Sequence, residues 1–280
     1  MNVRLWGTRG SLPAAGPETV RYGGNTSCVE VRPDGGGLVV LDAGSGLRRL
    51  GDRVDVVDRI DILLTHLHLD HIMGLGFFAP LFRPEIEVHL WGPSSSISDL
   101  RARISRYLNP PLFPVRLPDL PSRVVLHDVP LHRFTLPGLE VTADLICHPA
   151  PSVGYRLTDA TGTLTYLPDH EPALGCRVFP TTREWTSGSD LALEADVLLH
   201  DAQYTSEEYP ARVGWGHSSV AHAVAFAELV GARRLVGFHH DPGRTDDALD
   251  RLWDLSTWQR EPQLPVVPAH EGDTFTVSAA

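Results

Sequence analysis

Four residues with metal-binding side chains lie within six positions of the sequence, directly after an apolar run at residues 60–64. These residues are His66, His68, Asp70 and His71. Leu67 and Leu69 alternate with them, so the apolar side chains can anchor a turn while the polar ones converge. Imidazole nitrogens and carboxylate oxygens are good ligands for zinc and similar metals. A histidine-rich surface loop is the alternative, but the number and spacing of the ligands favour a metal site.

A single turn cannot supply every ligand of two metal ions, so the cluster needs partners from elsewhere in the chain. Three residues are candidates because each follows an apolar stretch with the character of a β-strand, namely His148, Asp169 and His239. Taken alone, a residue of this kind is more often structural or merely exposed. Their shared position after a strand is what makes these three residues candidate ligands.

A framework of short strands, separated by turn residues, must position these side chains. We expect strands at residues 3–6, 28–31, 38–41, 60–65, 123–129, 139–146, 153–158, 162–167, 197–199, 235–238 and 273–277. We expect helices from about residue 72, over 98–108 with Ser96 or Ser98 as cap, over 217–230 ending at Gly231, and over 246–258. The pattern predicts an α/β fold, an αββα four-layer sandwich in which two mixed β-sheets pack face to face with helices on the outer faces.

Composition limits the classes of function. A chain of 280 residues with 42% hydrophobic and 21% charged residues fits one globular domain over residues 1–280. The formal charge of −11 argues against broad binding to nucleic-acid polymers or anionic membranes. No apolar run approaches about 18 residues, so we expect no membrane span. Three cysteines without paired spacing, and no signal-peptide core, are typical of a cytoplasmic protein.

Further short motifs are spread along the chain. They lie at residues 7–11 (GTRGS), 21–27 (RYGGNTS), 41–46 (LDAGSG), 154–156 (GYR), 169–171 (DHE), 216–219 (GHSS) and 238–242 (FHHDP). Together with the histidine cluster and the three strand-end residues, they resemble the metallo-β-lactamase-fold hydrolases. The likeness is greatest to the branch of tRNase Z and the cyclic-nucleotide phosphodiesterase-like enzymes. It extends from Trp6 to about Asp247.

The resemblance implies a site for two divalent metal ions. It assigns to the first ion His66, His68 and His148. It assigns to the second ion Asp70, His71 and His239, with Asp169 bridging both ions. Two ions about 3.5–4 Å apart can share a hydroxide and polarise a phosphoryl oxygen. The ligands suit zinc, and manganese or iron also fits.

Two adjacent histidines, His239 and His240, follow the same predicted strand, and only one of them should face the site. The resemblance favours His239 as the ligand. His240 would then lie behind the ligands or face solvent.

His217 distinguishes branches of the superfamily. It lies in the Gly-His-Ser-Ser segment and resembles the histidine that protonates the leaving oxygen in the phosphodiesterase branch. The alternative is a helix-capping segment in which Ser218 or Ser219 acts as cap and His217 has no role. Asp70 would accept or orient the proton of the attacking hydroxide.

Asp42 and Asp201 both end apolar strands, and this repeat hints at two similar halves. The resemblance places Asp42 beneath the site, where a carboxylate can orient a histidine ligand. The alternative is a plain turn aspartate before glycine. Asn25 and Thr26, together with Arg9, are expected at the substrate edge.

A Pro-rich stretch covers residues 109–121 and should be a loop. The segment 107–115 at its start either roofs the pocket or packs Phe113 onto the core. The three tryptophans Trp185, Trp215 and Trp258 could serve either a core or a homodimer interface.

The leading hypothesis is a metal-dependent phosphodiesterase acting on a small phosphodiester such as a cyclic nucleotide, with a metal-bridging hydroxide as nucleophile and His217 as general acid. The alternative is an acyl hydrolase that cleaves a lactone, thioester or lactam on the same metals. Redox chemistry is disfavoured because diiron members of the fold place Glu where this chain has His68. A silent metal-binding protein is disfavoured by the intact ligand set.

The chain also departs from the family pattern. Pro168 and Ser219 stand where relatives commonly carry a small polar residue and Thr, respectively. No long basic arm for gripping transfer RNA is present, and with the charge of −11 this argues against cleavage of precursor tRNA.

Overall fold

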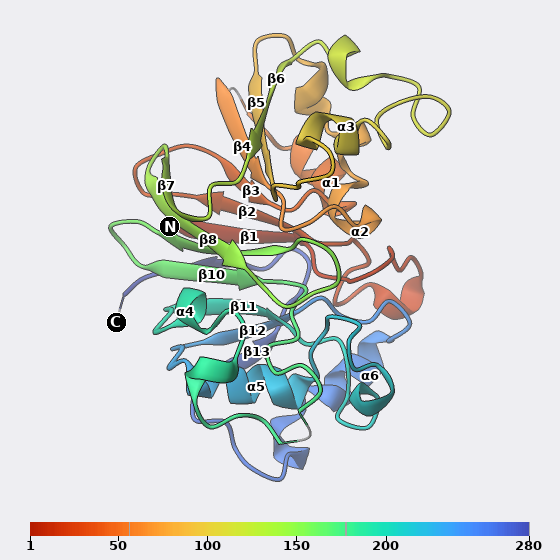
Figure 1. Cartoon of the computed structure of the whole chain (residues 1–280). Coiled ribbons are helices and arrows are strands. Elements are labelled where there is room, and N and C mark those ends of the chain that lie inside the picture. Colours follow the sequence, from red (N-terminus) through yellow and green to blue (C-terminus); the bar gives the residue numbers. More distant parts are fainter. Residues whose placement is uncertain (56, 177, 280) are drawn as a thin grey trace.

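Two seven-stranded β-sheets lie face to face at the centre of the protein (Figure 1). The computed structural model describes residues 1–55, 57–176 and 178–279. The first sheet contains, in spatial order, β14 (Thr274–Thr276), β1 (Asn2–Gly7), β2 (Cys28–Arg32), β3 (Val39–Leu41), β4 (Arg59–Leu63), β5 (Glu87–Gly92) and β6 (Arg123–Asp128). The second contains β13 (Val266–Pro268), β12 (Leu235–Phe238), β11 (Val197–Asp201), β10 (Thr163–Leu167), β9 (Val153–Thr158), β8 (Leu139–Leu145) and β7 (His132–Leu136).

Both sheets are mixed, and they are built alike. In the first sheet β1, β2 and β3 pair antiparallel, and β3 to β6 then run parallel. In the second sheet β7 to β10 pair antiparallel, and β10 to β13 run parallel. Parallel neighbours end on the same side of a sheet, so the residues that follow them are brought together.

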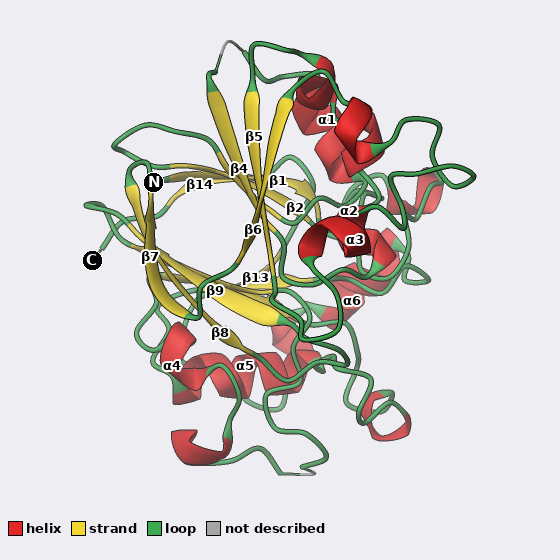
Figure 2. Ribbon diagram, turned by 45° about the horizontal axis from the view of Figure 1, so that its top comes forward, coloured by secondary structure: helices red, strands yellow, loops and turns green. Residues whose placement is uncertain are grey.

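Helices cover the outer face of each sheet (Figure 2). Over the first sheet lie α1 (Gly46–Gly51), α2 (Leu69–Ile72) and α3 (Leu100–Ile104), and over the second lie α4 (Ser189–Ala192), α5 (Val220–Leu229) and α6 (Asp246–Leu252). Short 3-10 turns occur at Pro17–Thr19, Leu75–Phe77, Ala79–Phe82, Leu117–Asp119, Arg183–Trp185, Tyr209–Ala211 and Leu255–Thr257. The predicted αββα sandwich is confirmed.

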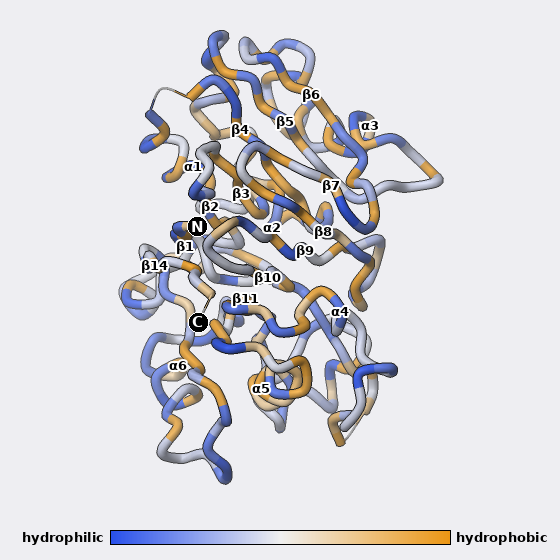
Figure 3. The backbone as a smooth tube through the Cα atoms, turned by 90° about the vertical axis from the view of Figure 1, so that its left-hand side faces the viewer, coloured by the Kyte–Doolittle hydropathy of each residue, from blue (hydrophilic) through white to orange (hydrophobic). Residues whose placement is uncertain are grey.

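Three buried clusters hold the layers together. The cluster between the sheets draws on both of them, for example through Leu5, Leu41, Tyr155 and Leu199. The other two clusters join each sheet to its own helices, and the hydrophobic colouring along α5 in Figure 3 marks one of them. Each fully buried aliphatic side chain contributes about 1.5–3 kcal/mol. Because the inner cluster is shared, we propose that the chain forms one domain.

The predicted helices were too long, and their caps explain why. The Asp99 carboxylate, not Ser96 or Ser98, accepts a hydrogen bond from the Ala102 amide and starts α3. The Ser219 hydroxyl accepts from the His222 amide, so α5 begins after His217 rather than at it.

Two other helix predictions were also wrong in their bounds. The helix expected from about residue 72 instead ends there, since α2 is a single turn over Leu69–Ile72. The helix expected to reach residue 258 stops at Leu252, and a 3-10 turn follows over Leu255–Thr257.

Most predicted strands are present within a residue or two of their expected ends. The sequence reading missed β5, β7 and β13. Among the described residues, no helix is long and apolar enough to cross a membrane.

Candidate metal centre

The candidate ligands follow strands whose carboxyl ends meet at one edge of the sandwich. His66 follows β4, Asp169 follows β10 and His239 follows β12. Asp42, directly after β3, and His239 adopt left-handed backbone conformations with φ of 58° and 59°. Residues other than glycine, asparagine and aspartate seldom adopt this conformation. It turns the chain sharply where the strand ends, at the point where the side chain must face the site.

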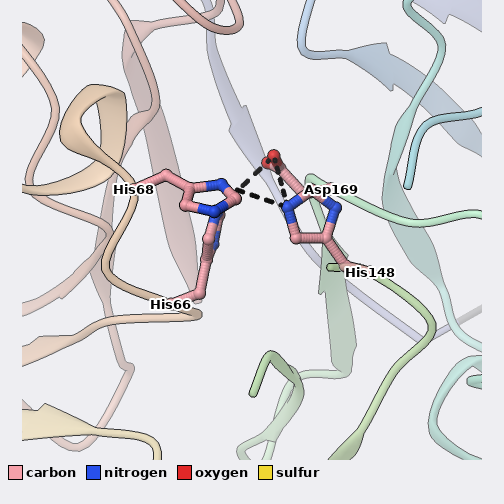
Figure 4. A group of neighbouring side chains, drawn as sticks. All are labelled: His66, His68, His148 and Asp169. Atoms are coloured by element: carbon pink, nitrogen blue, oxygen red, sulfur yellow. Dashed lines mark hydrogen bonds and ion pairs between the residues drawn. The ribbon is translucent and has the colours of Figure 1, made fainter. Parts of the chain in front are cut away.

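The first group consists of His66, His68, His148 and Asp169 (Figure 4). Each offers one ligand atom, and these atoms all lie within 4.8 Å of one another. His68 Nδ1 and His148 Nε2 lie 3.2 Å apart. His66 Nε2 and His148 Nε2 each lie 3.7 Å from Asp169 Oδ2.

The second group consists of Asp70, His71, Asp169 and His239, all of them buried. The Nε2 atoms of His71 and His239 lie 3.0 and 3.1 Å from Asp169 Oδ1. The same nitrogens lie 3.2 and 3.3 Å from Asp70 Oδ2. Asp169 therefore presents one carboxylate oxygen to each group.

The residues fit a pair of divalent cations. Within the described chain, His66 Nε2, His71 Nε2 and Asp169 Oδ1 are buried without any hydrogen-bond partner. Buried polar atoms are rarely left in this state, because each unsatisfied atom costs free energy. A pair of cations, one held by each group, would give all three atoms a partner.

The charge states of Asp169 and His66 also agree with metal binding. Burial would raise the pKa of Asp169, but His239, His71 and His66 outweigh it and hold that pKa well below its ordinary value. Burial lowers the pKa of His66 well below its ordinary value. An ionised carboxylate and a neutral imidazole are the forms that bind a metal.

Hydrogen bonds behind the ligands set which nitrogen faces the centre. His71 Nδ1 donates to Asp42 Oδ2 at 2.8 Å, and His148 Nδ1 donates to the Gly216 carbonyl at 3.0 Å. Both bonds leave Nε2 free to bind. Asp42 also accepts from the Thr65 amide and the Tyr166 hydroxyl. Asp42 is therefore more than a turn residue, because it orients a candidate ligand.

Two glycines let the backbone approach the histidines. A Cβ atom on Gly10 would lie 2.2 Å from His239 Nδ1, and one on Gly216 would lie 2.2 Å from His148 Nδ1. A side chain at either position would displace the histidine.

His217 lies beside the centre, on the loop before α5. Its Nδ1 atom donates to Asp201 Oδ2 at 2.7 Å and lies 4.0 Å from Asp169 Oδ2. Burial would lower the pKa of His217, but Asp201 outweighs it and raises that pKa to about 9. His217 can therefore carry a proton at neutral pH. Asp201 and His217 also form a third cluster with His239.

The adjacent histidines differ in direction. His239 belongs to the second group, whereas His240 is buried and its Nε2 donates to the Ala269 carbonyl at 2.9 Å.

The residues expected at the substrate edge are engaged elsewhere. Asn25 bonds to Glu271 and Ser45, and Thr26 accepts a hydrogen bond from the Ser45 amide. The Arg9 side chain is fully buried and donates to backbone carbonyls. Phe113 is buried in the cluster beneath α3, so the loop of residues 107–115 packs onto the core.

Sequence reasoning gave no role to Glu171. Its buried carboxylate accepts hydrogen bonds from the amides of Gly214 and Gly216 and from the Tyr209 hydroxyl. The Asp-His-Glu run at residues 169–171 was the signal for it. Sequence reasoning also missed Ser11, whose amide donates to Asp70 Oδ2 at 2.8 Å.

Comparison with known proteins identifies the family. The profile described as "Beta-lactamase superfamily domain" matches residues 38–240. The chain belongs to this superfamily. Among its relatives, the Ribonuclease Z of Natronomonas pharaonis is 26% identical over 85% of this chain and 86% of its own length. That of Myxococcus xanthus is 29% identical over 86% of this chain and 88% of its own length.

Solved structures show the same superfamily fold. The metallo-beta-lactamase fold protein YhfI of Bacillus subtilis gives a TM-score of 0.69 at 19% identity, covering 98% of this chain and 99% of that one. A diphosphatase from the PhnP family gives 0.67 at 20% identity, with 100% and 99% coverage. Human tRNase Z, short form, gives 0.67 at 22% identity, with 100% of both chains covered.

Zinc occurs in another structure of this superfamily fold, the Zn²⁺-bound PqqB of Methylobacterium extorquens (TM-score 0.68, 19% identity, 99% and 100% coverage). The superfamily match, the ribonuclease Z relatives and the His/Asp cluster together define the class. The chain is a metal-dependent hydrolase near the tRNase Z branch.

Proposed function

We propose that the protein hydrolyses a small phosphodiester, such as a cyclic nucleotide, at the edge where the two ligand groups meet. The observation that carries this proposal is the His217–Asp201 pair beside Asp169. A phosphodiester needs a proton on its departing alkoxide, whereas an activated lactam or thioester needs it less.

The proposed ligands are those of the two groups, with Asp169 shared between them, and zinc is the proposed metal. When bound, two divalent cations polarise the phosphoryl oxygen and make a water molecule more acidic. Asp70, held in place by the Ser11 amide at 2.8 Å, would accept or orient the proton of the attacking water. His217, protonated and fixed by Asp201, would donate a proton to the leaving oxygen.

A small substrate agrees with the charge of the chain. With a net charge of −11, the protein would repel a long polyanion except where cations are bound. We therefore propose a small-molecule substrate rather than an RNA polymer, although ribonuclease Z enzymes are among the relatives.

The experiment is the rate of bis(p-nitrophenyl) phosphate hydrolysis by zinc- and manganese-loaded protein. We expect metal-dependent turnover, and a fall in kcat of roughly 10²–10⁴-fold in His217→Ala at unchanged metal content. Asp201→Asn should also lower kcat, because it removes the charge that holds the proton on His217. No turnover beside efficient cleavage of a lactone or thioester would instead establish an acyl hydrolase.

A further inference from the structure

The glycines that precede His217 are held by the buried carboxylate of Glu171. The amides of Gly214 and Gly216 donate to Glu171 Oε2 at 3.0 and 2.9 Å, and the Trp215 amide donates to the Arg212 carbonyl at 3.0 Å. Glu171 is 1% exposed. A carboxylate is costly to bury unless its partners are in place, so these bonds hold the loop in one conformation.

The same loop lies against the metal centre. Gly216 accepts the hydrogen bond from His148 Nδ1, and its missing side chain lets the backbone contact His148 and Pro149 closely. Trp215 is the residue before Gly216, so its Cα atom lies about 3.8 Å from that of Gly216. His217 follows on the other side.

Trp215 is 60% exposed although it lies in this hydrogen-bonded turn. A large aromatic side chain normally gains free energy by being buried. On a mobile loop its exposure would need no explanation. The turn is held by hydrogen bonds and its Gly216 backbone contacts His148, so an exposed ring on it offers a surface that a planar ligand can cover without a large loss of entropy.

We propose that Trp215 is a stacking platform for the nucleobase of a nucleotide substrate. The base would lie on the indole while the phosphate lies between the ligand groups, on the side where His217 donates its proton. This inference rests on the proposed function and narrows its substrate class to phosphodiesters that carry a base. Aromatic stacking of this kind accepts every base, because each has a π-face.

The test measures binding rather than turnover. Adenosine 5′-monophosphate and ribose 5-phosphate carry the same phosphate group, but only the first has a base. We would titrate each into zinc-loaded protein by calorimetry. Stacking of one base strengthens binding roughly 5-fold to 150-fold, so the wild type should bind adenosine 5′-monophosphate tighter by at least about fivefold.

Three variants test the ring itself. Trp215→Ala and Trp215→Leu should reduce the ratio of the two affinities to within about twofold, while Trp215→Phe should retain much of it. Trp215→Leu keeps apolar bulk without an aromatic face, so a ratio preserved in this variant would overturn the proposal. The control is Trp185→Ala, which removes an indole that is 83% exposed and lies outside this loop, and should leave the ratio unchanged.

Other results would separate the explanations. If the wild type binds adenosine 5′-monophosphate and ribose 5-phosphate with nearly equal affinity, the proposal of a stacking platform is wrong, whatever the enzyme hydrolyses. If Trp215→Ala turned a dimer into a monomer in light scattering while the ratio persisted, the indole would be an interface and the proposal would be wrong. If the wild type shows the ratio but cleaves no phosphodiester, the platform stands and the proposed function fails.

Discussion

Nδ1 of His71 donates a hydrogen bond to Asp42 Oδ2 over 2.8 Å, and this bond joins the end of β3 to the residues that follow β4. The backbone of Asp42 is left-handed, and this conformation sets the direction of its carboxylate. The pair orients a candidate ligand of the second group from behind, so it should affect metal binding without contacting the metal.

Asp42→Asn should weaken binding of the second metal ion about 10–100-fold, because an amide anchors the imidazole less strongly than a carboxylate does. The measurement is competition for zinc with a chromogenic chelator. Unchanged affinity for both ions, in a folded protein, would show that His71 needs no such anchor.

Gly10→Ala and Gly216→Ala form a matched pair. The first would place a Cβ atom against His239, a member of the second group, and the second would place one against His148, a member of the first group. Each variant should lose affinity for a different ion, with metal content falling from about two to about one per chain. Atomic absorption after dialysis measures this. Two ions retained in both variants would contradict the assignment.

Glu171→Gln should loosen the loop that carries His217. The Gly214 and Gly216 amides donate to Oε2 and the Tyr209 hydroxyl donates to Oε1. The amide of glutamine has only one acceptor oxygen, so it cannot accept from both sides as the carboxylate does. We expect a loss of about 1–3 kcal/mol in the free energy of unfolding. We also expect a lower kcat, because His217 would no longer be fixed. Urea unfolding gives the first quantity. A free energy of unfolding equal to that of the wild type would show that the loop keeps its conformation without the Glu171 carboxylate.

Acid should destabilise the protein through the buried His200. Burial lowers the pKa of His200 to about 4, although the Asp201 carbonyl and charge oppose the shift. Its neighbour His170, whose Nδ1 lies 2.9 Å from His200 Nε2, has a pKa lowered by burial in the same direction. Between about pH 6.5 and 4 the unfolded chain therefore binds protons that the folded chain does not.

The contribution of His200 to stability should accordingly be complete above about pH 6.5. It should fall by on the order of 3 kcal/mol as the pH drops towards 4. The measurement is the midpoint of urea unfolding at a series of pH values. A His200→Phe variant should show a flatter profile, and an equally steep one would assign the effect to other groups.

The strands and the candidate ligands that follow them could be predicted from the sequence for the same reason. An apolar run followed at once by a histidine or aspartate marks both the strand and the ligand at its end. Two kinds of feature escaped this reasoning. Helix ends depend on which hydroxyl or carboxylate reaches a free amide, as with Ser219 and Asp99. The role of Glu171 depends on backbone amides, which any sequence possesses.

The choice between His239 and His240 shows the same limit. Both follow β12, and nothing in the residue types separates them. The structure places the His239 side chain in the second group, whereas His240 bonds to the Ala269 carbonyl.

Asp169 joins ligands that the chain carries on opposite sides of the turn between β6 and β7. A cut in that turn, after Asp128 and before His132, would leave His66, His68, Asp70 and His71 on one fragment. The other fragment would carry His148, Asp169 and His239. Neither would possess a complete coordination set, and β14 would belong to the second fragment while pairing with the first. If the two fragments were expressed separately, hydrolysis would report their reassembly, because the complete set of metal ligands forms only where the two fragments meet.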